Sequence, residues 1–147
     1  VATSLDLNWD PLWGSADAAR IEARKKAVLQ LLPLATLVHG NVRELNLFAG
    51  STDLRATLRQ LTTWGAEAVV IHLGADGAGY YHGGQVTVEP CAPVRRRVNT
   101  AGTGDLLSVC MMLLHRGEGM TVAGKLRLAN RVVAGVLEGE RMFLPVL

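Results

Sequence analysis

The residues best suited to chemistry are Gly102-Thr103-Gly104-Asp105, which stand directly before an apolar segment. Glycines let the backbone turn tightly and approach a ligand closely. If a helix begins here, its exposed N–H groups and the positive end of its dipole form an anion site. Asp105 is then either a capping carboxylate, worth about 0.5–2 kcal/mol, or a general base that takes a hydroxyl proton while the anion site binds a phosphoryl group. The local sequence leaves both interpretations open.

Asn41 and Glu44 form a second candidate pair, and their spacing puts both on the same side of a helix start. Together they could bind a hydrated magnesium ion and order a triphosphate. A capping pair on an ordinary helix explains the same spacing. These two residues alone do not decide between the two roles.

Other common motifs are not matched. No segment ends in Gly-Lys-Ser/Thr, so the chain has no Walker-type phosphate loop. The segment from Gly74 to Gly79 does not match the dinucleotide fingerprint, and a hairpin rather than a helix follows it. The four histidines share no metal-ligand spacing. His72 lies in a buried strand signal and is interpreted as a satisfied core histidine, so no histidine is assigned to catalysis.

Length, composition and charge indicate one globular domain and limit the classes of partner that the protein could bind. The 147 residues are about the size of one domain, and with 49% apolar and 19% charged residues they can form a packed core. The net charge of +2 is too small to indicate a nucleic-acid partner. No apolar stretch is long enough to cross a bilayer, and no signal peptide is visible, so no membrane partner is expected. The basic run Arg95-Arg96-Arg97 is either a solvated loop or an electrostatic lip near a phosphate site.

The two cysteines, Cys91 and Cys110, lie far apart without metal-ligand spacing. Cys110 lies in an apolar run and should be a buried thiol. The pattern is not a disulfide scaffold, and it fits a reducing cytoplasm.

The elements that must position these residues alternate between strand and helix signals, which is typical of a layered α/β domain with a mainly parallel sheet. Strands are expected up to about residue 8 and at 37–39 and 68–73, followed by a hairpin of 79–82 and 85–88. Helices are expected from about 17, from about 41, from 54 to 65, from about 104 to 115 and from about 121 to 138.

Taken in order, four segments resemble motifs of the ribokinase-like (PfkB) family of carbohydrate kinases. The family's Asp-x-Asn-x-Arg-x-x-Trp strand end is similar to Asp6-Leu7-Asn8-Trp9-Asp10-Pro11-Leu12-Trp13. Its Asn-x-x-Glu motif is matched by Asn41-Val42-Arg43-Glu44. Leu73-Gly74-Ala75-Asp76-Gly77-Ala78 resembles its Gly-x-x-Gly nucleotide segment. Asn99-Thr100-Ala101-Gly102-Thr103-Gly104-Asp105 resembles its Asp-Thr-x-Gly-Ala-Gly-Asp signature. The resemblance spans essentially the whole chain.

The resemblance implies a three-layer α/β/α fold with a mainly parallel central sheet. It also implies ATP-dependent phosphorylation of a hydroxyl group on a sugar or sugar acid. Asp105 would deprotonate the acceptor hydroxyl, and the backbone amides of Gly102, Thr103 and Gly104 would stabilise charge on the γ-phosphoryl group.

The resemblance also implies where nucleotide and metal would bind. Asn41 and Glu44 would position Mg²⁺, through water, and the phosphates of ATP. Gly74 and Gly77 would lie near the nucleotide phosphates and ribose, and Asn130 would reach the adenine side.

The sequence departs from the family pattern at three positions. Asn99 stands where the family usually has an Asp that helps to build a monovalent-cation site, so potassium activation is not implied. Thr103 replaces the usual Ala and either crowds the anion hole or adds a donor. Asp10 stands near the position of the family's Arg, so a phosphate or substrate contact there is not implied either.

Members of the family are much longer than this chain. Residues 1–147 are therefore expected to be the C-terminal nucleotide-binding and catalytic portion of a single ribokinase-like domain, a fragment without the N-terminal strands and the lid. That lid often makes homodimers, so a dimer is an expectation for the full-length parent only. The resemblance does not imply activity for the fragment alone. A non-catalytic nucleotide-binding or regulatory module and an inactive truncated product remain the alternatives.

Overall fold

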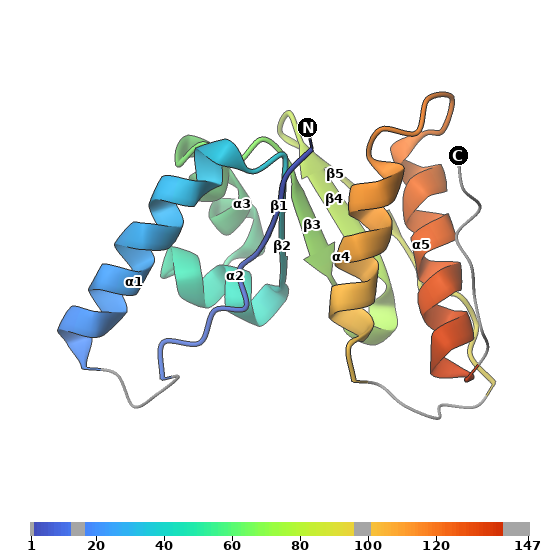
Figure 1. Cartoon of the computed structure of the whole chain (residues 1–147), viewed down its shortest axis with the longest axis horizontal. Helices are drawn as coiled ribbons and strands as arrows, with labels where there is room; N and C mark the ends of the chain where they lie inside the picture. The colour runs from blue at the N-terminus through green and yellow to red at the C-terminus, as the bar shows by residue number, and fades with distance from the viewer. Residues whose placement is uncertain (1, 13–16, 96–100, 140–147) are drawn as a thin grey trace.

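The computed structural model describes residues 2–12, 17–95 and 101–139. Its five strands form one sheet in the order β1-β2-β3-β4-β5 (Figure 1). The strands are β1 (Ser4–Asp6), β2 (Leu37–Asn41), β3 (Val69–His72), β4 (Ala78–His82) and β5 (Gln85–Glu89). The first three strands are parallel, and β4 and β5 continue the sheet as an antiparallel hairpin.

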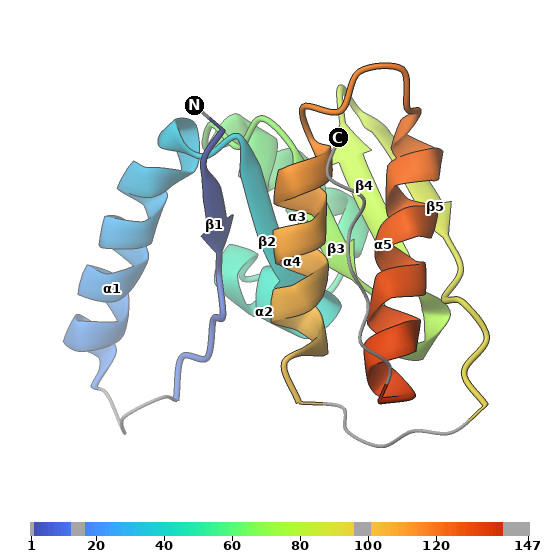
Figure 2. The ribbon, with the colours of Figure 1, turned by 45° about the vertical axis from the view of Figure 1, so that its right-hand side comes forward.

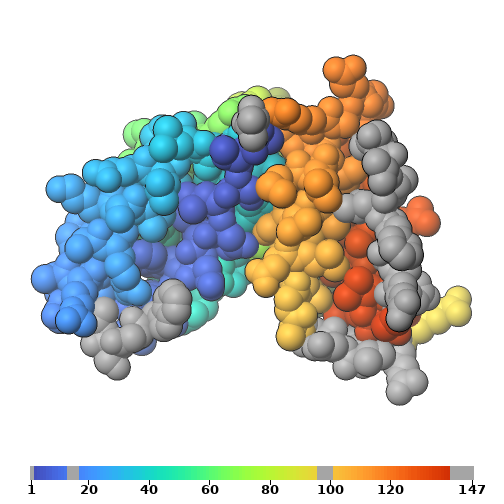
Figure 3. Space-filling view, in the orientation of Figure 1, coloured from blue at the N-terminus to red at the C-terminus, as the bar shows by residue number. Residues whose placement is uncertain are grey.

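Helices cover both faces of the sheet, which confirms the expected three-layer α/β/α architecture (Figure 2). One face is covered by α1 (Ala18–Leu31), α2 (Val42–Ala49) and α3 (Leu54–Thr63). The other face is covered by α4 (Thr103–Leu114) and α5 (Val122–Leu137). Short 3₁₀ turns, η2 (Leu32–Leu34) and η3 (Gly74–Asp76), precede β2 and follow β3. In the space-filling view the surface of β1 lies between α1 and α4 (Figure 3).

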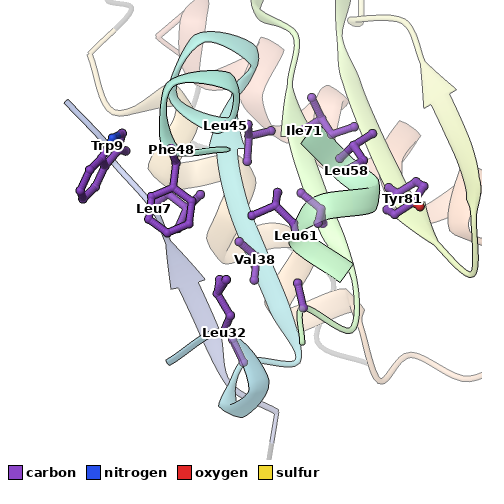
Figure 4. Close-up of a cluster of buried hydrophobic side chains, with 13 residues drawn as sticks. Leu7, Trp9, Leu32, Val38, Leu45, Phe48, Leu58, Leu61, Ile71 and Tyr81 are labelled. Atoms are coloured by element: carbon purple, nitrogen blue, oxygen red, sulfur yellow. The ribbon is translucent and has the colours of Figure 1, made fainter. Parts of the chain in front are cut away.

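The core between the sheet and the first three helices forms because alternate strand residues point to one face. Val38 and Ile71 face α2 and α3, where they meet Leu45, Phe48, Leu58 and Leu61, all almost fully buried (Figure 4). The indole ring of Trp9 closes this core, with its centroid 5.1 Å from that of Phe48 in an edge-to-face arrangement.

The second core lies between the sheet and α4 and α5. Leu37 and Val70 point to this face and pack with Leu107, Met111 and Leu126. Cys110 is buried here as predicted, and burial raises the pKa of its thiol to about 11. Cys91 is exposed, and both thiols are free.

Most element boundaries agree with the sequence-based expectations. Asp17, Asp53 and Thr121 cap their helices through side-chain oxygens that accept backbone N–H groups. The first strand is shorter than predicted and ends at Asp6, because Asn8 adopts a positive φ of 39° and its N–H donates to Asp6 Oδ1 over 3.3 Å. No helix among the described residues is long and apolar enough to cross a membrane.

Candidate active site

Asp105 and the glycine turn stand at the start of α4. Gly102 is the N-cap residue with φ +75°, a left-handed conformation that favours glycine. A Cβ atom added at Gly102 would lie 4.0 Å from Asp105 Oδ2, so the carboxylate lies back over the turn. Among the described residues, nothing donates a hydrogen bond to Asp105, and no side chain caps the helix. Asp105 therefore does not act as a cap in this structure, and its carboxylate is exposed beside the helix N-terminus.

Asn41 and Glu44 form a reciprocal capping box at the start of α2. The Glu44 N–H donates to Asn41 Oδ1 over 2.9 Å, and the Asn41 N–H donates to Glu44 Oε2 over 3.1 Å. The capping role is thus confirmed for this pair. The box also fixes both half-buried side chains at the carboxyl end of β2, where Asn41 pairs with His72 of β3.

A cavity of about 240 Å³ opens beside the glycine turn. Its walls come from β3, η3, the segment after β5, α4 and α5. The lining residues are His72, Gly74, Ala75, Gly77, Cys91, Ala92, Val94, Thr103, Gly104, Leu107, Asn130, Val133, Ala134 and Leu137. Apolar walls with a few polar groups are typical of small-molecule sites.

The cavity brings five predicted site residues together from separate parts of the chain: Gly74, Gly77, Thr103, Gly104 and Asn130. The other predicted residues do not line it. Asp105 and Gly102 flank Thr103 and Gly104 in sequence and lie just outside the cavity. The Asn41–Glu44 pair lies at the end of the neighbouring strand, β2.

Gly74 and Gly77 differ in what requires a glycine. A Cβ atom on Gly77 would lie 2.1 Å from the Glu89 carbonyl oxygen and 2.6 Å from the Cys91 nitrogen, so the chain after β5 packs directly against this glycine. A Cβ atom on Gly74 would meet no atom within 4 Å. Close packing therefore accounts for Gly77, whereas Gly74 leaves open space at the cavity wall.

Asn130 reaches the cavity from α5, but its amide nitrogen is already bonded. It donates to the carbonyl oxygens of Glu89 and Pro90 over 3.0 and 2.9 Å. These two bonds use both amide hydrogens, so Asn130 holds the wall of the cavity and has only its carbonyl oxygen to offer a ligand.

A polar cluster that sequence analysis missed lies between the strand ends and α4. The Ser108 hydroxyl donates to Asp6 Oδ2 over 3.1 Å and lies 3.2 Å from His72 Nε2. Burial lowers the pKa of His72, whereas the nearby carboxylates of Asp6, Glu44 and Asp105 raise it. The His72 ring therefore lies within electrostatic range of both Glu44 of the capping box and Asp105 of the glycine turn. It makes the side-chain bond expected of a core histidine, but it also lines the cavity.

His39 lies on the same face of the sheet and is completely buried. Burial is the largest effect on its pKa and, together with His72, lowers it to about 4, although Asp6 raises it in part. Neither ring nitrogen has a hydrogen-bond partner among the described residues. His39 is therefore neutral in the folded protein near neutral pH.

Some predictions fall outside the described residues. Arg96 and Arg97 of the basic run and Asn99 of the cation-site position belong to this group, as does Trp13. Arg95 is described: it is exposed, and its N–H donates to the Glu138 carboxylate. The electrostatic lip and the monovalent-cation site stay predictions.

Comparison with known proteins places these features in a family. Residues 9–139 match the family model described as pfkB family carbohydrate kinase. No curated protein matches the chain.

Three solved structures illustrate the similarity of fold. The adenosine kinase from Sinorhizobium meliloti is 18% identical with a TM-score of 0.73, over 95% of this chain and 40% of that one. A putative Ribokinase II from E. coli, in complex with ATP and Mg²⁺, is 20% identical with a TM-score of 0.76, over 93% and 42%. The aminoimidazole riboside kinase from Salmonella enterica, complexed with aminoimidazole riboside and an ATP analog, is 22% identical with a TM-score of 0.73, over 93% and 46%. The chain spans less than half the length of each.

Proposed function

The chain belongs to the pfkB family of carbohydrate kinases, and on this premise we propose that the protein transfers the γ-phosphoryl group of ATP to a hydroxyl group of a sugar or sugar acid. The observation that carries the proposal is the position of Asp105. Its exposed carboxylate lies over the glycine turn at the N-terminus of α4, beside a cavity that the same turn lines. A base and an anion site are thereby adjacent, as phosphoryl transfer to an alcohol requires.

Each residue of the turn has a role in the proposed step. The acceptor oxygen attacks the γ-phosphorus, the bond from that phosphorus to the bridging oxygen of ADP breaks, and the hydroxyl proton passes to the Asp105 carboxylate. The backbone N–H groups of Gly102, Thr103 and Gly104 stabilise negative charge on the phosphoryl oxygens. The positive end of the α4 dipole adds to this stabilisation.

Asn41 and Glu44 fit a water-mediated Mg²⁺ site. One oxygen of Glu44 serves the capping box, while the second makes no hydrogen bond to a described residue. Mg²⁺ retains several waters and binds through one or two carboxylates. We propose that Glu44, and Asn41 beside it, would hold Mg²⁺ through water, and that the ion would supply positive charge opposite the phosphates of ATP. For Asn41, whose Oδ1 is engaged in the cap, this contact is indirect.

The cavity is the proposed nucleotide site. Gly74 lies at its open wall, and Asn130 and Gly77 hold the opposite chain segment in place. The putative Ribokinase II from E. coli, a protein of similar fold, was solved in complex with ATP and Mg²⁺, which supports the choice of donor.

We propose that residues 1–147 are the C-terminal nucleotide-binding and catalytic portion of a longer ribokinase-like domain, whose remaining part binds the sugar and forms any homodimer. The free thiols of Cys91 and Cys110 support a cytoplasmic location.

Asp105→Asn in the intact protein tests the function. With a panel of sugars and sugar acids, we expect kcat to fall by about 10²–10⁴-fold, because a general base contributes that much, while ATP affinity measured by calorimetry stays near wild type. Asp53→Asn is the matched control, because it makes the same chemical change at an exposed helix cap where Asn serves equally well.

Wild-type turnover in Asp105→Asn would contradict the role of this residue. If the wild-type protein shows an ATP-dependent rise in melting temperature but phosphorylates no acceptor, the result would favour a non-catalytic nucleotide-binding module. Neither binding nor turnover would favour an inactive product.

A further inference from the structure

Asp6, His72 and Ser108 connect three elements at the carboxyl ends of the parallel strands. Asp6 is the last residue of β1, His72 is the last residue of β3, and Ser108 lies on the buried side of α4. The Ser108 Oγ atom lies 3.1 Å from Asp6 Oδ2 and 3.2 Å from His72 Nε2. The other oxygen of Asp6 accepts the Asn8 N–H, so the carboxylate is itself oriented by the chain that leaves β1.

The direction of these bonds fixes the tautomer of His72. A serine hydroxyl has one proton, and in this geometry Ser108 gives it to Asp6. The bond between Ser108 and His72 must then be donated by Nε2–H. In neutral His72 the proton is therefore on Nε2, and Nδ1 faces α4, 3.2 Å from where a Cβ atom of Gly104 would lie.

These contacts act on the part of α4 that bears the proposed base. Ser108 follows Gly104 by four residues and Asp105 by three, so it lies about one helical turn behind them. The other contacts of α4 with the sheet are mainly apolar, from residues such as Leu107 and Met111. Apolar burial is non-directional, whereas hydrogen bonds to β1 and β3 specify the height and rotation of the helix.

We propose that Asp6, Ser108 and His72 form a positioning network, in which their hydrogen bonds and the close approach of the His72 ring to Gly104 hold the first turn of α4 in register with the strand ends. The inference rests on the proposed function, because it assigns these residues to the placement of Asp105 and of the anion site. They are positioning residues, and none of them takes part in proton or phosphoryl transfer.

Ser108→Ala in the intact protein removes the central hydroxyl and is the primary test. We expect kcat to fall by about 10- to 100-fold, since a misplacement of about 1 Å at a reacting group can cost that much. The KM for ATP should change by less than about threefold, because Ser108 does not line the cavity. Val109→Ala, on the exposed side of the same helix, is the control and should match wild type.

Two substitutions at His72 separate the hydrogen bond from the bulk of the ring. The amide nitrogen of Gln can reach the position of Nε2 and donate to Ser108, whereas that of Asn reaches only the position of Nδ1. We expect His72→Gln to retain at least about tenfold more kcat than His72→Asn. If His72 only filled space, the two variants would not differ in kcat according to which donor atom they restore.

Two measurements by NMR do not depend on turnover. The ¹⁵N shifts of the His72 ring should show the proton on Nε2 in the wild-type protein. The Leu106 N–H, which donates to Gly102 over 2.9 Å, should exchange faster with solvent in Ser108→Ala than in Val109→Ala.

The network is overturned if Ser108→Ala keeps the kcat of Val109→Ala, if Gln and Asn at position 72 are equivalent, or if the His72 proton is on Nδ1. These results are distinct from failure of the proposed function. If the proposed function fails, the wild-type protein will phosphorylate no acceptor. The tautomer of His72 and the exchange rates of the Leu106 N–H would then still decide whether the network positions α4.

Discussion

Lowering the pH from about 7.5 to about 5 should reduce the free energy of unfolding through His39. This side chain on β2 is completely buried, and its ring nitrogens have no hydrogen-bond partner among the described residues. Desolvation, with a smaller contribution from His72, lowers its pKa from 6.5 to about 4, against an opposing attraction from Asp6. The folded protein therefore resists protonation that the unfolded chain accepts.

The sign and size follow from this pKa difference. Above pH 6.5 His39 is neutral in both states, and its contribution to stability is fully present. As the pH falls from 6.5 toward 4, only the unfolded state gains the proton, so stability is lost. With these two pKa values, about 2 kcal/mol is lost between about pH 7.5 and about pH 5.

Reversible urea unfolding of the wild-type protein and of His39→Leu at both pH values measures the effect. Leu fills much of the same space and cannot titrate, so its loss of stability should be smaller than that of the wild type by about 2 kcal/mol. His72 and His115, whose pKa values burial also lowers, are present in both proteins, so the difference between the two losses reports His39 together with its interaction with His72. An equal loss in both proteins, or an NMR titration of His39 near 6.5, would refute the reasoning.

Two further outcomes are expected from particular residues. Gly77→Ala should destabilise the protein by at least about 3 kcal/mol in urea unfolding, because its new Cβ atom would overlap backbone atoms, with the nearest only 2.1 Å away. Gly84→Ala, at a positive φ of 81° with no atom within 4 Å of the added Cβ atom, should cost only about 1–2 kcal/mol, and similar losses for both would contradict the packing role. Under native conditions, an alkylating reagent at about pH 8 should modify Cys91 rapidly and Cys110 hardly at all, because burial raises the pKa of Cys110 to about 11. Mass spectrometry of the peptides checks this, and equal labelling would contradict it.

The layered fold could be predicted from the sequence because its signals are local. Asp17, Asp53 and Thr121 precede helical apolar patterns, and each caps a helix in the structure. The Gly83-Gly84 turn between two short strands likewise gives the β4–β5 hairpin, with both glycines at positive φ. Capping and turn chemistry act within a few residues, so a single chain displays them without any tertiary information.

The polar cluster around Ser108 could not be predicted in the same way. Ser108 and Asp6 are 102 positions apart in sequence, and they meet only if β1 and α4 have the observed phase and rotation. A shift of one residue along β1 would turn Asp6 to the opposite face of the sheet. The sequence pattern predicts a first strand up to about residue 8 and a core role for His72, so neither side chain has a defined direction in the sequence.

From the sequence, both Asp105 and the Asn41–Glu44 pair could be either helix caps or functional residues. The structure shows a capping role for the pair and none for Asp105 among the described residues. Helix α2 begins with a complete capping box, so its first N–H groups are partly satisfied within the protein. Helix α4 begins at Gly102, where, among the described residues, no side chain caps the helix. A serine or aspartate at that position would be strained by the φ of +75° and would occupy a donor that an anion needs. Among the described residues, no side chain caps α4 and nothing donates a hydrogen bond to Asp105, and a helix N-terminus beside such a carboxylate is the arrangement expected where an anion and a proton are to be bound.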